Sequence, residues 1–390
     1  SGSAPVSSAS LQAAPDNLPS RSEAELQQRQ RQGDLQVRTA ADYRVLVGDV
    51  GLAEAYRRTD VVVAANAEFT DQASLVLHLG PSDPPIRVRR FRLGAAEGIG
   101  GHGNTDLALP LGQGGARVLA ELLAGERLAL SLSGDGTVQQ PRLELESSIS
   151  LPEIGAGRLL LHRGISENGV VAVSSREGRL STPWGPVLGP LTTALYSCGG
   201  AGSIGLTMPG LKLLGPGSPV LVAGGVGWVS GAGSGHNPEA RRLPSGHALS
   251  PGACAAVEVD LHSLDPQWLR ATRLEGGGTG LLVAIAAPVP LMDATAAQQA
   301  AAGNGELQAP VLDFGVPRRV RPSHGQASYQ QLQSGRLSLD GRWLTCAPGH
   351  SPRLASAIAE ELAQRLRAGT FPLRLPLQPL PRRASLLALD

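Results

Sequence analysis

The sequence predicts an α/β fold with mixed sheets, a glycine-rich central β region and a C-terminal amphipathic helix. Three observations lead to this prediction. Apolar runs of strand length outnumber the helical patterns. The helical patterns cluster toward the two ends of the chain, which argues against a regular doubly wound array. Fifty Gly and thirty Pro among 390 residues indicate many turns between short strands.

The N-terminal region is predicted to contain a disordered leader, residues 1–21, and an α/β part, residues 22–157. Ser22-Glu-Ala-Glu25 has the spacing of a capping box and predicts a short polar helix that ends near Gly33. The β-branched run from Asp60 to Ala65 predicts a buried strand. The same reasoning predicts helices at 40–47, 52–58 and 115–124, and strands at 75–79, 86–93, 128–133 and 143–149.

The remainder is predicted to form a glycine-rich, β-containing core, residues 158–350, and a C-terminal helix with a Pro-rich tail, residues 351–390. Apolar residues recur at spacings of three and four over 353–368, which predicts the clearest amphipathic helix of the chain. After Phe371, Leu alternates with Pro, which predicts an extended tail. Buried strands are predicted at 159–161, 170–173, 220–223, 255–259 and 281–286.

Composition limits the classes of function. A net charge of +1 gives no reason to expect nucleic acid or an anionic membrane surface as a partner. No apolar run approaches the roughly 18 residues that a membrane-spanning helix needs. An odd number of cysteines, three, without a secretory signal indicates a reducing compartment, and we predict a cytoplasmic protein. No bound cofactor is predicted, and no ligand spacing predicts a metal site.

The glycine-rich segments are the best candidates for a site: Tyr196 to Ile204, Val220 to Trp228 and Gly231 to Pro238. Glycine lets the main chain approach a ligand closely and adopt positive φ angles. In the first segment Cys198 is a candidate nucleophile, with Ser197, Gly199 and Gly200 supplying donors to an anion. The alternative is that Cys198 is a small buried residue on a tight turn, since free Cys is often buried.

Other polar residues are candidate ligands for a small-molecule substrate. His236 and Asn237, in Gly235-His-Asn-Pro238, predict an acid–base group or an anion donor, although a histidine satisfied within its loop is an equal alternative. Adjacent prolines hold Ser82 and Asp83 on a rigid loop. Together with Arg163, these residues have the chemistry to bind a small carboxylate or phosphate.

Several motifs together resemble the homocysteine-biosynthesis (sulfur-incorporation) family, whose archaeal members include the aspartate-semialdehyde sulfurtransferase. The resemblance runs from about residue 30 to residue 380. The matching segments are Asp60-Val-Val-Val, Gly80-Pro-Ser-Asp-Pro-Pro-Ile86, Gly134-Asp-Gly136, Ala194-Leu-Tyr-Ser197, Ala223-Gly-Gly-Val-Gly-Trp228, Gly233-Ser-Gly-His-Asn-Pro238, Asp265-Pro-Gln-Trp-Leu-Arg270, Pro288-Val-Pro290 and Asp313-Phe-Gly-Val-Pro317.

The resemblance implies transfer of reduced sulfur to the aldehyde of aspartate semialdehyde, which gives homocysteine after reduction. It also implies a cysteine that carries sulfur as a persulfide, and an external reductant such as an iron–sulfur, ferredoxin-like partner. The family pattern places one cysteine shortly before the Ser-Asp-Pro-Pro loop and another after an arginine. In this chain the corresponding segments, 69–74 and 163–168, contain no cysteine, which leaves Cys198 as a relocated nucleophile.

Three hypotheses about function therefore stay open. The first is a sulfur-transfer enzyme that uses Cys198. The second is an enzyme with different small-molecule chemistry that needs no covalent thiol. The third is a non-catalytic binding or assembly protein, suggested by the missing cysteines, the polar leader and the Pro-rich tail. The sequence also leaves a homo-oligomer open.

Overall fold

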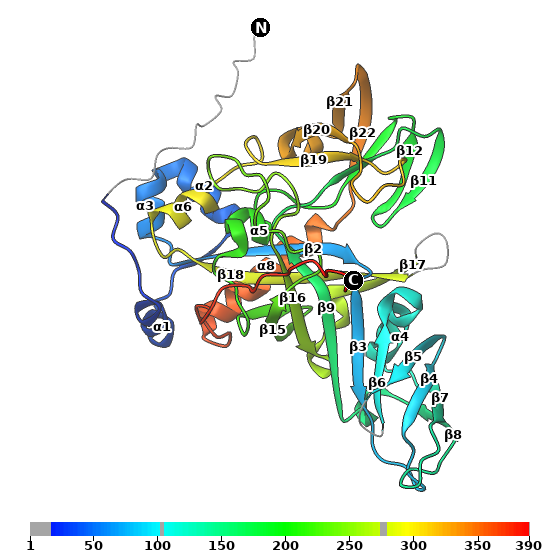
Figure 1. Ribbon diagram of the computed structural model, residues 1–390. Coiled ribbons are helices and arrows are strands. Elements are labelled where there is room, and N and C mark those ends of the chain that lie inside the picture. Colours follow the sequence, from blue (N-terminus) through cyan, green and yellow to red (C-terminus); the bar gives the residue numbers. More distant parts are fainter. Residues whose placement is uncertain (1–16, 102–104, 274–278, 390) are drawn as a thin grey trace.

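The computed structural model describes residues 17–101, 105–273 and 279–389, and it confirms an α/β fold with mixed sheets. Within these residues a 14-stranded sheet runs through the middle of the molecule, and a six-stranded sheet lies above it (Figure 1). A two-stranded hairpin, β11–β12, flanks the smaller sheet. The 14-stranded sheet supplies much of a large apolar core, and a smaller core fills the six-stranded sheet.

The elements have the following bounds. The α-helices are α1 (Glu23–Gln32), α2 (Ala40–Val50), α3 (Leu52–Arg57), α4 (Gly115–Leu123), α5 (Ile204–Thr207), α6 (Ala294–Ala300), α7 (Tyr329–Gln333) and α8 (Pro352–Ala368). The large sheet contains β1 (Val37–Thr39), β2 (Val61–Thr70), β3 (Ala73–His78), β4 (Val88–Leu93), β5 (Ala96–Gly100), β6 (Asp106–Pro110), β7 (Leu128–Gly134), β8 (Glu144–Ile149), β9 (Ala156–Ser166), β14 (Pro219–Val222), β15 (Gly225–Ala232), β16 (Cys254–Asp260), β17 (Leu269–Arg273) and β18 (Thr279–Pro290). The other strands are β10 (Val171–Val173), β11 (Gly178–Thr182), β12 (Gly185–Gly189), β13 (Thr193–Tyr196), β19 (Gln308–Asp313), β20 (Ser323–Ser328), β21 (Arg336–Leu339) and β22 (Arg342–Pro348).

Strand β2 lies next to the edge of the large sheet, between β1 and β18. It pairs antiparallel with β18 along its whole length, from Val61 opposite Pro290 to Thr70 opposite Leu281, and parallel with β1 at its start. Helix α8 packs across β1, β2 and β18. The apolar side chains of α8, among them Ile358, Leu362 and Leu366, are buried, which confirms the amphipathic helix predicted from the 3.6-residue period.

The predicted elements of the N-terminal part are confirmed, with shifts of a few residues at their ends. The Ser22 hydroxyl accepts from the Glu25 N–H while the Glu25 carboxylate accepts from the Ser22 N–H, and Gly33 ends α1 in the left-handed region. The sequence missed several short strands, including the hairpin β11–β12 and the pair β21–β22. These strands are only four to seven residues long, so even the alternation in Arg336-Leu-Ser-Leu339 gives a weak periodic signal.

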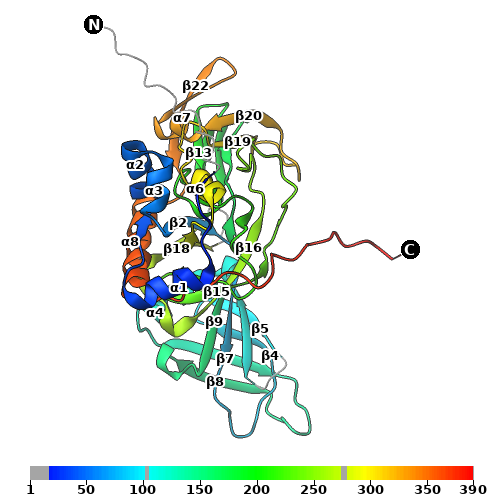
Figure 2. The same cartoon turned by 90° about the vertical axis from the view of Figure 1, so that its left-hand side faces the viewer.

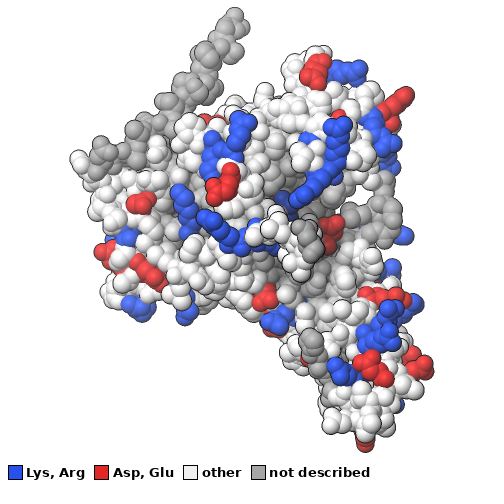
Figure 3. Space-filling model, in the orientation of Figure 1, with Lys and Arg blue, Asp and Glu red and all other residues white. Residues whose placement is uncertain are grey.

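Strands β4 to β8 and helix α4 form an arm that projects from the body, while β3 connects it to β9 of the main sheet (Figures 1 and 2). Charges of both signs are interspersed on the face of the arm shown in Figure 3. Ion pairs such as Arg92–Glu97 and Arg127–Glu153 belong to this part of the chain. At the other end, the chain after α8 forms no helix or strand over residues 371–389, and its last part projects from the body in Figure 2.

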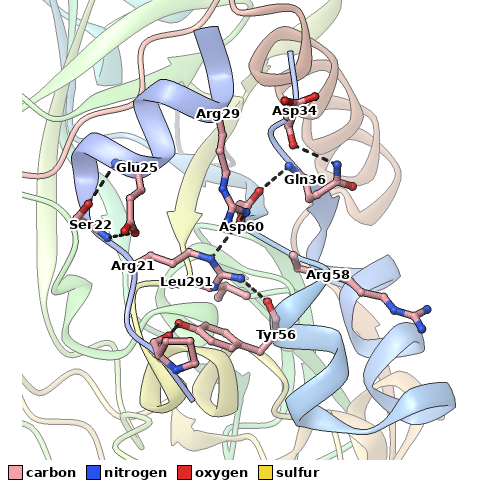
Figure 4. Close-up of polar contacts among 12 residues, drawn as sticks. Arg21, Ser22, Glu25, Arg29, Asp34, Gln36, Tyr56, Arg58, Asp60 and Leu291 are labelled. Atoms are coloured by element: carbon pink, nitrogen blue, oxygen red, sulfur yellow. Dashed lines mark hydrogen bonds and ion pairs between the residues drawn. The ribbon is translucent and has the colours of Figure 1, made fainter. Parts of the chain in front are cut away.

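A buried ion-pair cluster ties the N-terminal segment to the start of β2 (Figure 4). The side chain of Asp60 is fully buried, and its Oδ1 lies 3.1 Å from Arg21 Nε and 2.6 Å from Arg29 Nη1. Its Oδ2 accepts from the Gln36 N–H at 2.9 Å. Arg21 also donates to the carbonyl of Leu291, so the cluster links the N-terminal segment, the start of β2 and the residue that follows β18. Residues 1–16 of the predicted leader lie outside the described residues.

Among the helices of the described residues, none combines the length and apolar character that crossing a bilayer requires.

Replacement of Asp60 by Asn is expected to destabilise the protein strongly. The Arg21 side chain is only 9% exposed, so losing its counter-ion leaves a buried charge without compensation. Breaking such a pair costs about 3–5 kcal/mol. The matched control is Arg29→Gln, because the Arg29 side chain is 47% exposed and exposed pairs contribute about 0–1 kcal/mol. Urea denaturation measures both changes, and an equal effect of the two variants would contradict the assignment of Asp60 as the anchor.

Candidate active site

Two polar side chains on β2 face the glycine-rich turn that contains Cys198. Asn66 and Glu68 are two residues apart on a strand, so they share one face. The turn is fastened to β2 by the Ile204 N–H, which donates to Asn66 Oδ1 at 2.9 Å, and by the Ala65 N–H, which donates to the Gly202 carbonyl at 3.0 Å. The pairing of β2 with β18 thus fixes the position of both side chains relative to the turn.

The turn itself needs glycine for steric reasons. Gly200 has φ +79°, and a Cβ atom built there would lie 2.5 Å from Asn304 Oδ1 and 2.7 Å from Tyr329 Cγ. On the other side, a Cβ atom on Gly169 would lie 2.4 Å from Ser197 Oγ and 2.6 Å from Cys198 Cβ. Cys198 is therefore enclosed between backbones that approach closely only because both residues are glycine.

Cys198 is a buried thiol in a polar setting. Its side chain is 2% exposed, and its Sγ lies 3.4 Å from Ser203 Oγ, within hydrogen-bonding distance. Burial, and after it the charge of Glu68, raises the pKa of Cys198 to about 11, although the Ser203 hydroxyl and the Gly200 N–H act in the opposite direction. The thiol is consequently protonated at neutral pH, and forming a thiolate requires a base beside it.

Glu68 is such a base, and sequence reasoning missed it. Burial raises the pKa of Glu68 to about 8, while the charge of Arg163 and a hydrogen bond with Cys198 lower it in part. A carboxyl group with a pKa near the working pH is suited to accept and return a proton. The available signal was the placement of Asn66 and Glu68 on one face of an otherwise apolar run.

A cavity of about 380 Å³ adjoins Glu68 and the turn. Two segments of the chain line this cavity. The first, residues 69–72, lies at and just after the end of β2. The second lies at and just after the end of β9 and contributes Arg163, Gly164, Ser166 and Asn168. Ser197 lines the same cavity, so the neighbour of Cys198 opens onto it.

A second thiol, Cys254, lies at the edge of this site. The Ser166 hydroxyl donates to its Sγ at 3.6 Å. Burial raises the pKa of Cys254, with the charge of Arg163 lowering it and that of Glu68 raising it. The sequence offered no chemistry for Cys254, and only the pairing of β16 with β9 places it beside Ser166. All three cysteines are free and buried, Cys346 in the core of the smaller sheet.

The structure brings together only some of the residues that the sequence predicted. Arg163 and Ser197 line the cavity, while Gly199 and Gly200 belong to the turn. His236 Nδ1 accepts from the Cys254 N–H at 3.0 Å, and burial lowers the pKa of its imidazole. It is therefore a neutral ring that holds the strand carrying the second thiol.

The other predicted residues, Asn237, Ser82 and Asp83, do not line the cavity. The Asn237 side chain is exposed, and its N–H donates to the Gly252 carbonyl. Ser82 and Asp83 lie in the loop between β3 and β4, on the arm and outside the cavity lining. The Ser82 hydroxyl donates to the Pro84 carbonyl, and the Asp83 carbonyl accepts from Arg142. Their roles as substrate ligands stay a prediction. In the described part of the chain, no three His, Cys, Asp or Glu side chains converge as metal ligands.

Comparison with known proteins connects this geometry to a family. The family described as homocysteine biosynthesis enzyme, sulfur-incorporation, matches residues 35–373. The L-aspartate semialdehyde sulfurtransferase of Methanocaldococcus jannaschii is 27% identical over 373 residues, covering 89% of this chain and 70% of that protein. The L-aspartate semialdehyde sulfurtransferase of Methanosarcina acetivorans is 27% identical over 370 residues, covering 93% of this chain and 72% of that protein. No solved structure matches the chain.

Glu68 gives the stability of the protein a pH dependence that a variant can test. Its pKa is about 8 in the folded protein, against 4.5 as the ordinary value for an unfolded chain. Between these two values the folded state retains a proton that the unfolded chain has lost, so stability falls as pH rises through this window. Above the folded pKa the contribution becomes constant.

Replacement of Glu68 by Gln is expected to remove that slope. Urea midpoints of wild type and variant, measured at several values between pH 5 and pH 9, are compared as differences. The difference should shift steadily in favour of the variant up to about pH 8 and then level off. Glu360→Gln, an exposed change on α8, is the control. Parallel curves for wild type and Glu68→Gln would show that Glu68 titrates normally.

Proposed function

The chain belongs to the homocysteine biosynthesis family of sulfur-incorporation enzymes, and from this premise we propose that it transfers sulfur to the aldehyde of aspartate semialdehyde or of a related small metabolite. The observation that carries the proposal is that Glu68 and Ser197, the neighbour of Cys198, line one cavity, with the charge of Glu68 acting on the Cys198 thiol. Residues 69–72 and Arg163 line that cavity, and they belong to the two segments in which the sequence resemblance implies cysteines.

The proposed roles follow from the contacts. Glu68, when ionised, takes the proton of Cys198 and leaves a thiolate that can bind sulfane sulfur as a persulfide. The guanidinium of Arg163 interacts electrostatically with Glu68 and with Cys254. It is the cation best placed to offset negative charge that develops on an aldehyde oxygen in the same cavity.

The reaction needs electrons from outside the protein. When the terminal sulfur of a Cys198 persulfide adds to the aldehyde carbon, a carbon–sulfur bond forms and the carbonyl oxygen takes a proton. Two electrons and two protons then cleave the sulfur–sulfur bond and restore the thiol. Loss of water followed by two more electrons and two more protons yields the thiol product. An external reductant, such as a ferredoxin-like iron–sulfur partner, is therefore part of the proposal.

The burial of Cys198 favours a second mode of sulfur transfer, in which sulfide adds to the aldehyde without a carrier thiol. Cys198 is buried and its pKa is raised, which are properties of an unreactive thiol. If free sulfide adds to the aldehyde directly, no carrier thiol is needed, and two electrons with two protons complete the conversion to thiol and water. The cavity and Glu68 would serve this route equally well. A cytoplasmic location and a homo-oligomer stay predictions.

Homocysteine formation tests the proposal. The purified protein is incubated with aspartate semialdehyde, a reductant and either polysulfide, which supplies sulfane sulfur for a persulfide, or sulfide, which serves only the direct route, and homocysteine is measured by mass spectrometry. Wild type, Cys198→Ser, Cys254→Ser and the control Cys346→Ser are assayed side by side. We expect product with wild type and Cys346→Ser, and a loss of at least about 100-fold with Cys198→Ser, as for removal of a covalent nucleophile.

The other outcomes discriminate between the hypotheses. Full activity of both Cys198→Ser and Cys254→Ser would overturn the carrier role of these thiols and establish direct use of sulfide. Loss with Cys254→Ser alone would move the carrier role to the second thiol. No product from any variant, with the same reductant supporting the Methanosarcina acetivorans enzyme, would overturn sulfur transfer in favour of other pocket chemistry or a binding role.

A further inference from the structure

A second cavity, of about 170 Å³, lies next to the first and shares part of its wall. Asn66 and Glu68 line both cavities. Ser197 lines the first and Gly199 the second, so the two neighbours of Cys198 open onto different cavities. Glu68 therefore stands in the wall between the two spaces, and Cys198, which belongs to neither lining, lies behind that wall between its two lining neighbours.

Two hydrogen-bond donors of the second cavity have no acceptor. Asn66 is 5% exposed, and its Oδ1 is occupied by the Ile204 N–H, which assigns Nδ2 to the opposite edge of the amide. That Nδ2 is buried without a partner. Arg44, on α2, also lines the cavity, and its Nη1 is buried without a partner. Leaving buried donors unsatisfied is costly, so their convergence on one cavity points to a ligand that supplies acceptors.

The charge of the cavity specifies the kind of acceptor. Arg44 carries a permanent positive charge. One side of the first two turns of α8 contributes Pro352, Ala355, Ser356 and Ala359 to the lining, and none of these residues carries a charge. The remaining acidic group, Glu68, stands at the far wall toward the first cavity. A compact anion such as a carboxylate matches this arrangement.

His350 adds a contact of the opposite polarity. Its Nδ1 lies 3.1 Å from the Tyr196 carbonyl, which can only accept, so the neutral ring carries its proton on Nδ1. Nε2, on the side of the ring near Gly199, is then an acceptor. A ligand that presents a carboxylate to Arg44 and Asn66 and an ammonium group to His350 has the end group of an amino acid.

We propose that the second cavity binds the amino-acid end of the substrate, with Arg44 and Asn66 holding its carboxylate and His350 Nε2 accepting from its amino group. The reactive carbon of the substrate then lies at the boundary with the first cavity, beside Cys198 and Glu68, and the first cavity is left for the sulfur donor. This inference rests on the proposed function for the identity of the reaction, but the binding site is tested independently of turnover.

The test is calorimetric binding of L-homoserine, which has the same amino-acid end and carbon chain as aspartate semialdehyde but no reactive aldehyde. Arg44→Met removes the guanidinium. Asn66→Asp keeps the oxygen that accepts from Ile204 and replaces the free donor with a negative charge. Arg57→Gln is the matched control, because Arg57 is exposed and pairs only with Glu54 on the neighbouring helix α3. The carboxamide of L-homoserine tests the need for a carboxylate.

We expect wild type and Arg57→Gln to bind L-homoserine alike, and Arg44→Met and Asn66→Asp each to bind it about 10- to 100-fold more weakly, as for loss of a hydrogen bond to a charged group. The carboxamide should bind weakly to all four proteins. Because Arg44 Nη1 makes no hydrogen bond in the described structure, Arg44→Met should leave the thermal midpoint unchanged or raise it. A fall in the midpoint of the same size as that of Asp60→Asn would mark Arg44 as structural and overturn the proposal.

Three results would overturn the proposal: equal affinity of wild type, Arg44→Met and Asn66→Asp; equal affinity for homoserine and its carboxamide; or binding of inorganic phosphate but not of homoserine by wild type. The two proposals can also fail separately. Arg44-dependent binding of homoserine without homocysteine formation supports the binding site and contradicts sulfur transfer. Homocysteine formation with an unchanged KM in Arg44→Met supports sulfur transfer and contradicts the binding site.

Discussion

The pairing of β2 with β18 over ten residues is the constraint on which the rest of the site depends. At its start, β2 is anchored by the buried carboxylate of Asp60, which gathers Arg21, Arg29 and Gln36. Toward its end, the same strand presents Asn66 and Glu68 to both cavities. Because side chains alternate along a strand, a shift of one residue in register would turn both groups into the opposite face.

Burial raises the pKa values of the two reactive groups at this strand, Glu68 and Cys198. Withdrawal from water favours the neutral forms of both Cys198 and Glu68, so the resting site holds a thiol beside a carboxylic acid rather than an ion pair. A site of this kind becomes reactive when a ligand or a change of protonation alters the balance between the two groups. Arg163 and Arg44 approach it from different sides, one in each cavity, and each offers positive charge to a different part of a substrate.

The arm formed by β4 to β8 and α4 takes no direct part in this chemistry, because its described residues do not line the first cavity. It is connected to the main sheet through the pairing of β3 with β9, and β9 also carries Arg163 and Ser166 at its other end. The Ser82–Asp83 loop connects β3 and β4. It does not line the first cavity, although β3 pairs with the strand that carries Arg163. A loop on such an arm can contribute to the site only through a partner or through motion of the arm.

By itself the sequence determined the elements with strong local signals: the capping box of α1, the amphipathic period of α8, the apolar run of β2 and the glycine-rich turn around Cys198. These depend on residues a few positions apart, and such spacing can be read from the chain. It also determined the family, through many short motifs. Only the tertiary structure decided that Arg44, Asn66, Glu68 and His350 surround that turn. They come from three segments up to about 300 residues apart, and no local rule reports which distant polar groups will meet around one cavity.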